Sequence, residues 1–287
     1  MPTNGPQSPG GPQPPGAPQP PGAPQSPDGP QPPGAPQPPG GQQPPGAGTL
    51  PEPQVRAMFD RIARVYDRMN SVMTAGLHHT WRRRAAELAA LRPGDRALDV
   101  ATGTGDLAFE LGHRVAPDGL VVGADFSQRM LEIARAKREA LRAVTTAPAG
   151  VELRFEQANA LALPYPDDEF DAATVGFGAR NFSDLRGGLA EMTRVVRPGG
   201  RVVVLEITTP TEGPMALVLH VWFDRLVPLV GRLAGDADAY TYLPSSVRRF
   251  PPPRELAAIM SEVGLGEVRY ILTAGGIIAL HVGTVMG

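Results

Sequence analysis

Apolar residues recur at helical spacing in several stretches of the chain. Val55, Met58, Phe59, Ile62, Val65 and Tyr66 lie on one face and predict an amphipathic helix. A second helix is expected from about Trp81 to Leu91, where Pro93-Gly94 ends it. Four later helices are expected at about 106–115, from a Ser127 cap through Leu141, at 184–196, and from Pro253 to near Gly264.

Short apolar runs alternate with these helices. They predict strands at 96–101, 120–125, 151–158, 170–176, 201–207, 267–272 and 277–283. This alternation indicates an α/β fold with a mostly parallel, seven-stranded sheet and helices on both faces. The short link Ala274-Gly275-Gly276 predicts that the last two strands form an antiparallel hairpin. Ligands of such sheets bind at the carboxyl ends of the strands, so the residues there are the candidates for function.

The first 48 residues have another composition. They contain 19 of the 34 prolines, 11 of the 34 glycines, and repeats of PQPPGA. Gly is not at every third position, which excludes a collagen helix, and so few apolar residues predict a disordered tail of polyproline II character. Either this tail binds an aromatic-lined groove, or it is a solvated extension without a partner. Residues 49–287 are expected to form one domain.

Other totals exclude several classes of protein. Without Cys, the chain has no disulfide scaffold, thiolate nucleophile or Cys-ligated metal. A net charge of -2 does not favour nucleic-acid binding. No apolar run is long enough to span a membrane, and the N-terminus does not have the pattern of a secretory signal. A cytoplasmic protein is expected, either soluble or peripheral at the inner face of the membrane.

A glycine turn follows the first strand. Gly103 and Gly105 let the backbone approach a ligand closely, and the next helix begins beneath it. The turn also fits a loose dinucleotide pattern. Asp99 at the strand end and Asp106 in the first turn of the helix would repel a pyrophosphate, so a cationic ligand such as S-adenosylmethionine is favoured. Asp106 could equally serve as a partner of the helix dipole.

Acidic and amide side chains follow the next two strands. Asp125 ends the second strand, where a carboxylate can accept hydrogen bonds from both hydroxyls of a ribose. Alternatively, it only caps the helix that follows. Asn159 and Ala160 follow the third strand and could meet an adenine edge, although Asn159 could be a simple turn residue.

Longer motifs resemble a known family. LDVATGTGD (98–106), the acidic end of the second strand and RPGG (197–200) resemble the Rossmann-like class I S-adenosylmethionine-dependent methyltransferases. YDRMN (66–70) with Met73-Thr74, His78 and Trp81, and RVVRPGG (194–200) with Glu206 and Thr208, resemble signatures of the UbiE/MenG quinone C-methyltransferases. The resemblance spans about 52–287, including FGARN (177–181), and implies cofactor contacts at Thr74, Asp125, Asn159 and Ala160. Gly176 stands where that family usually has Ser, which removes a hydroxyl.

This resemblance implies methyl transfer to a ring carbon of a polyprenyl hydroquinone, such as demethylmenaquinol. Arg180, after the fourth strand, is then expected to stabilise a phenolate, with Asn181 positioning the ring. Tyr66 and His78 are candidates for a proton relay, although Tyr66 could be a core residue and His78 a loop residue. No spacing typical of a metal site is present, and no metal is expected.

The remaining alternatives concern the acceptor and the partners. The apolar segment Met215–Leu233, within a lid expected at about 212–250, is a candidate for gripping a prenyl tail at a bilayer surface. It could equally be a buried core helix or a homodimer contact. A ubiquinone-pathway benzoquinol or a soluble small aromatic are the other acceptors considered. A non-catalytic scaffold, in which the Pro-rich tail is the working part, is the alternative of another class.

Overall fold

A computed structural model describes residues 51–143, 150–209 and 237–287, together with Met1. Side chains of residues 237–241 and 243 are not described. Apart from Met1, the described residues belong to one compact unit, Pro44–Gly287. The expected tail, 1–48, and the apolar segment Met215–Leu233 lie outside the described residues.

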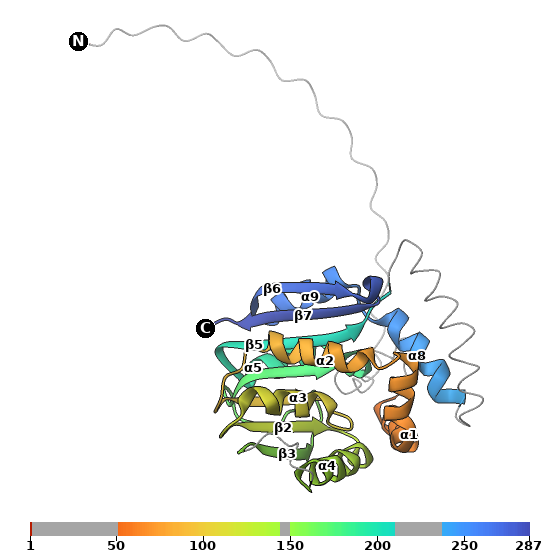
Figure 1. Cartoon of the computed structure of the whole chain (residues 1–287). Coiled ribbons are helices and arrows are strands. Elements are labelled where there is room, and N and C mark those ends of the chain that lie inside the picture. Colours follow the sequence, from red (N-terminus) through yellow and green to blue (C-terminus); the bar gives the residue numbers. More distant parts are fainter. Residues whose placement is uncertain (2–50, 144–149, 210–236) are drawn as a thin grey trace, which may run out of the picture. The chain divides into compact units, whose positions relative to one another are not determined.

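The sheet of this unit has seven strands in the order β3-β2-β1-β4-β5-β7-β6 (Figure 1). The first five strands are parallel, and β7 runs antiparallel to both β5 and β6. All six residues of β2 are buried, as expected for a strand covered on both faces. The predicted mixed sheet with a closing hairpin is confirmed. Its strands are β1 (Arg96–Val100), β2 (Leu120–Asp125), β3 (Glu152–Gln157), β4 (Phe170–Gly176), β5 (Val196–Ile207), β6 (Leu265–Thr273) and β7 (Ile278–Val285).

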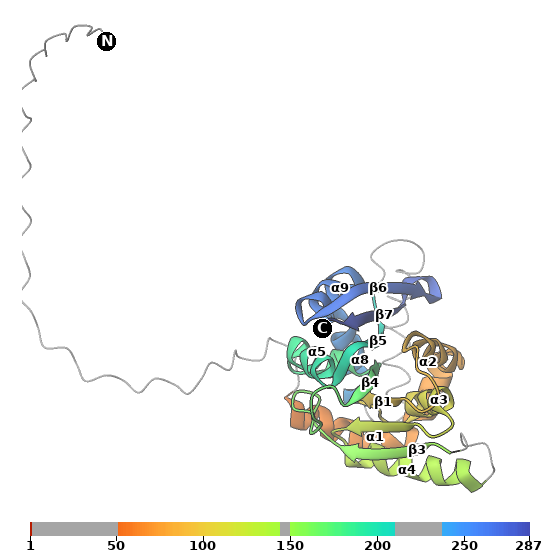
Figure 2. The ribbon, with the colours of Figure 1, turned by 90° about the vertical axis from the view of Figure 1, so that its left-hand side faces the viewer.

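Helices cover both faces of the sheet (Figure 2). On one face lie α2 (Leu77–Leu88), α3 (Asp106–Val115) and α4 (Gln128–Ala143), which bury Ala85, Leu111 and Leu131 against the strands. On the other face lie α5 (Leu185–Arg194) and α9 (Pro253–Glu262), which bury Met192 and Met260. The two cores hold the strands in place, so the carboxyl ends of β1, β2 and β4 form a fixed edge.

The two remaining helices lie beyond that edge. Helix α1 (Glu52–Met73) packs against α8 (Ala237–Arg249) through a third apolar cluster that includes Val55, Met58 and Tyr242. Figure 1 shows both helices at one end of the sheet. The 3-10 turn η1 (Ala179–Asn181) follows β4 beneath α8, and a second such turn, η3 (Ala274–Gly276), joins β6 to β7. Residues far apart in the chain therefore enclose the edge of the sheet.

Some expected boundaries are wrong. Helix α2 begins at Leu77 and ends at Leu88, so His78 is a helix residue and not a loop residue. Strand β5 begins at Val196, five residues early, because Val196 pairs with Phe170 before the register shifts. The part of the expected lid from Ala237 to Arg249 is helix α8. Within the described ranges, no helix is both long and apolar enough to cross a bilayer.

Candidate functional site

A cavity lies where the carboxyl ends of β1, β2 and β4 meet α1. It contains about 940 Å³ of empty space, counting its open mouth. Its aromatic walls come from Phe59, Tyr66, Phe126, Phe177 and Phe182. Gly103 also lines it. Polar side chains line the rest, several of them predicted from the sequence: Glu52, Arg82, Asp99, Thr102, Thr104, Asp106, Asp125, Asn159, Asn181 and Ser183.

The two glycines of the turn after β1 have different surroundings. Gly103 lines the cavity at φ 57°, and a Cβ there would meet nothing within 4 Å. Gly105, at φ 87°, is not among the lining residues, and a Cβ there would lie 3.0 Å from the Phe155 ring. Both conformations are costly for other residues. Gly103 therefore keeps the cavity open, whereas Gly105 allows the loop to pack closely on β3.

Asp125 combines deep burial with an open side on the cavity. One carboxylate oxygen accepts the backbone N–H of Gly103 at 2.8 Å, and the other accepts that of Ser127 at 2.8 Å. Burial raises the pKa of Asp125 to about 6, although these two N–H donors oppose the rise. The side chain is fixed, and each oxygen keeps a second lone pair for a ligand hydroxyl. The arrangement is compatible with the ribose contact expected from the sequence, in which a carboxylate at the end of the second strand accepts from hydroxyls.

Asp99 also lines the cavity, but its oxygens are directed at neighbouring hydroxyls. It accepts hydrogen bonds from Thr102 Oγ1 at 2.6 Å and Thr174 Oγ1 at 2.7 Å. Its pKa is raised to about 6 by complete burial, while the two threonines act in the opposite direction. Asp99 thus fixes the end of β1 to β4. A direct contact with a ligand would use the lone pairs that remain.

On the far wall, Asn159 is held by α1. Its amide Nδ2 donates to Glu52 Oε1 at 2.9 Å, and its Oδ1 accepts the N–H of Leu161 at 2.9 Å. Ala160 lies beside it on the cavity wall. The side chain of Asn159 is thus part of a turn, as the simpler expectation had it, and it also faces the cavity.

Helix α1 is attached to the loops after three neighbouring strands by three carboxylates. Glu52 binds Asn159 after β3, Asp60 accepts from Ser127 Oγ after β2 at 2.5 Å, and Asp67 accepts from Thr104 Oγ1 after β1 at 2.6 Å. The spacings of eight and seven residues repeat one side of a helix. Sequence reasoning missed these contacts, although the spacing of the three acids was a visible signal.

The chain's one lysine joins this network. Lys137 Nζ, from α4, lies 2.6 Å from Asp67, 2.7 Å from Asp106 and 2.9 Å from Thr104 Oγ1. Arg82 lies 3.5 Å from Asp106 on its other side. Burial alone would raise the pKa of Asp106, but Arg82 and Lys137 outweigh it and lower the pKa. Asp106 is therefore neutralised by two cations, and the expected repulsion of a pyrophosphate by this residue is weaker than the sequence suggested.

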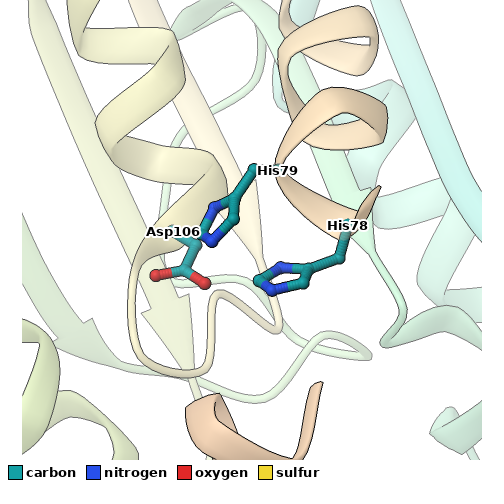
Figure 3. A group of neighbouring side chains, drawn as sticks. All are labelled: His78, His79 and Asp106. Atoms are coloured by element: carbon teal, nitrogen blue, oxygen red, sulfur yellow. The ribbon is translucent and has the colours of Figure 1, made fainter. Parts of the chain in front are cut away.

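His78 and His79 approach Asp106 from α2 (Figure 3). One ligand atom of each of these three residues lies within 4.8 Å of the others. Such a trio could hold a metal ion, which the sequence spacing did not indicate. However, the Arg82 guanidinium bonds His78 Nδ1 and contacts Asp106, and Lys137 contacts Asp106 too. These cations lie against His78 Nδ1 and both carboxylate oxygens of Asp106, so a divalent ion that used those atoms would have to displace them.

His78 itself is buried and neutral. Its Nε2 is 3.1 Å from Ser71 Oγ, its Nδ1 pairs with Arg82, and it is not among the residues that line the cavity. Burial, followed by Arg82 and His79, lowers its pKa to about 4. Thr74, whose hydroxyl donates to the Asn70 carbonyl at 2.6 Å, does not line the cavity either. These two predicted residues are bonded to each other, through the His78 N–H and Thr74 Oγ1, and neither lines the cavity.

Arg180 forms a buried ion pair with Glu206. Arg180 NH1 is 2.8 Å from Glu206 Oε1, and NH1 also donates to the Phe177 carbonyl. Although burial opposes it, Glu206 and then Tyr66 raise the pKa of Arg180. The Nε of Arg180 is buried without a hydrogen-bond partner among the described residues. Glu206 appeared in the sequence only as part of a motif, because its role depends on β5 lying next to β4.

Asn181 and Tyr66 complete the side of the cavity next to Arg180. Both line the cavity, and Asn181 Oδ1 accepts from the Tyr242 hydroxyl of α8 at 3.1 Å. Arg180 itself is not among the lining residues, although it directly precedes Asn181 in η1. The predicted catalytic residues Arg180, Asn181 and Tyr66 are thus brought together, with His78 apart from them.

Solved structures with this fold include S-adenosylmethionine-dependent methyltransferases. One from Thermotoga maritima, described as a possible histamine N-methyltransferase, has a TM-score of 0.54 at 20% identity, covering 79% of this chain and 98% of its own. Another, from Aquifex aeolicus, has a TM-score of 0.50 at 18% identity, covering 71% and 89%. At such identities the likeness shows the fold alone. The fold is that of the S-adenosylmethionine-dependent methyltransferases, as expected.

Sequence comparisons identify the family, which the fold alone does not. Residues 48–285 match the ubiE/COQ5 methyltransferase family, and the chain belongs to that family. It is 49% identical to a demethylmenaquinone methyltransferase of Thermus thermophilus, over 79% of this chain and 99% of that protein. It is 40% identical to a ubiquinone/menaquinone biosynthesis C-methyltransferase of Teredinibacter turnerae, over 80% and 91%. The protein is therefore a methyltransferase that uses S-adenosylmethionine as its methyl donor.

Proposed function

We propose that this protein transfers a methyl group from S-adenosylmethionine to a ring carbon of a polyprenyl hydroquinone, specifically demethylmenaquinol. One observation carries the proposal beyond the family: a buried carboxylate, an aromatic side chain and an amide side chain line the same cavity, and a buried arginine directly precedes the amide residue in the chain. Asp125 lines it at the end of β2, and Tyr66 and Asn181 line it beside Arg180. A donor and an aromatic acceptor can be held next to one another there.

Several features of the cavity suit the methyl donor. Asp125 offers lone pairs to ribose hydroxyls, Gly103 leaves room for a ligand against the backbone, and Asn159 and Ala160 form a wall for an adenine. The donor supplies a methyl group already activated by its sulfonium charge. We therefore assign its binding to Asp125, Gly103, Asn159 and Ala160. Asp99 also lines the cavity, but two of its lone pairs accept from threonines, and Gly105 and Thr74 do not line it, so these three have a lesser part in the proposal.

On the acceptor side, the protein must favour the phenolate of the quinol. Loss of the phenol proton makes the adjacent ring carbon nucleophilic. That carbon forms the new bond to the methyl group as the carbon–sulfur bond breaks, and the sulfur keeps the electron pair. The ring carbon then loses its proton, which restores the aromatic ring. An oxidised quinone has no phenol to ionise, so only the reduced form reacts.

We assign stabilisation of that phenolate to Arg180. Its buried Nε–H has no hydrogen-bond acceptor among the described residues and is therefore available to the phenolate oxygen. Glu206 positions Arg180 and keeps it charged. Asn181 orients the ring, and Tyr242 holds Asn181 in turn. Tyr66 is the group of this cluster that can pass on the phenol proton. The buried, neutral His78 fits better as a partner that positions Arg82 than as a relay.

The remaining assignments concern regions and partners. We propose that residues 1–48 are an appendage to a methyltransferase domain at 49–287, with a lid at about 212–250 that grips the prenyl tail. The protein is expected to work at a membrane surface and without a metal ion or a nucleic acid. A homodimer stays a prediction, which light scattering of the purified full-length chain tests directly.

One assay tests the proposed reaction. The full-length protein is incubated with S-adenosylmethionine and a short-chain demethylmenaquinol under reductant, and mass spectrometry follows the addition of one methyl group. Product with the quinol and none with the oxidised quinone is the expected result. A benzoquinol is assayed as a second acceptor, because some relatives are named for both ubiquinone and menaquinone biosynthesis. Turnover of only a tail-less phenol, or cofactor binding without turnover of any acceptor, would contradict the proposal.

A further inference from the structure

The outward side of α1 carries a basic and apolar stripe. Arg61, Arg64, Val65, Arg68 and Val72 are all exposed, and their spacing of three, one, three and four residues places them on one face of the helix. Val65 is 42% exposed and Val72 75%. Leu77, at the start of α2, is 51% exposed. We call these six residues the outer stripe.

The charge of this face follows from how α1 packs. The helix contains three acids and four arginines. Its acids, Glu52, Asp60 and Asp67, bind Asn159, Ser127 and Thr104 at the edge of the sheet. All three acids are partly buried, so every fully exposed charged residue of α1 is an arginine. Packing against the sheet has thus sorted a nearly neutral helix into an acidic inner side and a basic outer side.

The same helix forms part of the cavity wall. Phe59 and Tyr66 face the cavity, whereas Val65 and Val72 are exposed. Helix α1 therefore has the cavity on one side and the exposed outer stripe on the other. A surface that combines arginines with exposed aliphatic residues is typical of helices that lie in the interface of anionic membranes.

We propose that the outer stripe docks the protein on an anionic lipid bilayer, with α1 lying along the surface. The proposal rests on the proposed function, because a polyprenyl quinol is dissolved in a bilayer and must reach the cavity from there. The arginines match the negative surface potential of anionic lipids, and each contributes electrostatic attraction near the surface. Val65, Val72 and Leu77 add apolar area that water would otherwise cover.

Binding to vesicles tests the stripe directly. The full-length protein is sedimented with vesicles of phosphatidylcholine alone or mixed with phosphatidylglycerol, and we expect binding to the anionic vesicles that weakens with salt. Arg64→Glu with Arg68→Glu should weaken it on the order of 30-fold or more, from about 1 kcal/mol for each arginine. The matched control, Arg254→Glu with Arg269→Glu, changes two exposed arginines of α9 and β6 and should leave binding nearly unchanged.

An apolar pair of variants completes the test. Leu77→Ser should weaken binding to anionic vesicles, whereas Leu272→Ser should not, although Leu272 is 49% exposed on β6. The proposal would be overturned if the wild-type protein did not bind anionic vesicles. Equal losses of vesicle binding in the stripe and control variants would also overturn it. Binding that requires a second protein in place of lipid would also overturn it.

Activity separates this proposal from the proposed function. The Arg64→Glu/Arg68→Glu variant should methylate a water-soluble short-chain quinol at the wild-type rate, but act poorly on a long-chain quinol embedded in anionic vesicles. If the wild type methylates the short-chain quinol but binds no vesicles, docking fails and the function stands. If it binds vesicles but methylates no quinol, the proposed function fails while the membrane contact stands.

Discussion

The guanidinium of Arg180 and the carboxylate of Glu206 form an ion pair at 2.8 Å, with 7% and 1% of the two side chains exposed. The pair joins the turn after β4 to the end of β5. A buried pair of this kind adds little net stability, but removing one partner leaves an uncompensated charge. Glu206 also bonds the backbone N–H groups of Arg180 and Ile207, at 3.3 and 2.9 Å. It therefore fixes the turn as well as the guanidinium.

Removing Arg180 should affect turnover and stability more than cofactor binding. Arg180→Ala is expected to lower kcat about 10²- to 10³-fold, as for loss of one donor to a developing anion. The Kd for S-adenosylmethionine should change little, since the contacts of Asp125 do not involve Arg180. Steady-state kinetics and calorimetric titration measure the two effects. Equal losses in kcat and cofactor affinity would contradict the phenolate role.

The same variant should destabilise the fold by about 3–5 kcal/mol, because Glu206 is left buried and unpaired. The double variant Arg180→Met/Glu206→Leu should recover most of that loss in a urea denaturation experiment, yet remain inactive. This control separates a structural effect from a catalytic one. An active double variant would rule out both assigned roles.

Cofactor affinity should depend on pH through Asp125. The pKa of this buried carboxyl is raised to about 6, so the free protein is increasingly protonated there as pH falls. A ribose hydroxyl donates best to the charged form, and the affinity should therefore fall as pH decreases from 7 to 5. Asp125→Asn should weaken binding at pH 7.5 by at least about tenfold and flatten the pH dependence. Titrations of both proteins across this range, in one buffer series, test the expectation.

Loss of Lys137 should loosen α1. Lys137→Met removes the cation between Asp67 and Asp106, and Arg82 is left to face Asp106. We expect a loss of roughly 1 kcal/mol, because the three groups are partly exposed. Faster hydrogen exchange in residues 52–73 should accompany it, with weaker cofactor binding. Lys137→Arg keeps the charge and should behave nearly as the wild type; unchanged exchange in Lys137→Met would exclude this role.

Gly176 offers a gain of affinity. This residue lines the cavity at the end of β4, and a Cβ there would lie 3.1 Å from Leu107 Cδ2, which a small shift of that side chain relieves. Gly176→Ser adds the hydroxyl that the family resemblance leads us to expect at this position. It should tighten S-adenosylmethionine binding about twofold to tenfold, the range for one net hydrogen bond. Gly176→Ala adds the same Cβ without the hydroxyl and should give no gain.

Deletion of residues 1–48 should leave the kinetics of quinol methylation unchanged. The family match begins at residue 48, and the first 47 residues contain no Lys, Arg, His or Tyr and a single carboxylate, Asp28. The truncated and full-length proteins are compared in the same quinol assay, with unfolding temperatures as a check on folding. An inactive but folded truncation would show that the tail takes part in the reaction.

Local patterns along the chain were enough to predict the helices and strands and many of the residues that line the cavity. Alternating apolar runs predicted the seven strands, because strands covered on both faces need continuous apolar residues. The carboxyl ends of parallel strands gather at one edge, so the sequence alone placed Gly103, Asp125 and Asn159 there. The sequence also predicted that Ser127 caps the helix after β2. The structure confirms this cap, because the Met130 N–H donates to Ser127 Oγ at 3.2 Å.

Packing decided the contacts between segments distant in the chain. Arg180 and Glu206 are 26 residues apart, Lys137 and Asp67 are 70 apart, and no periodicity joins them. Burial, which raises the pKa of Asp125 and makes His78 neutral, depends on what covers each group from other elements. The orientation of α1 is likewise tertiary: helical spacing places its three acids on one side, but only contact with the sheet edge turns that side inward and leaves arginines outside.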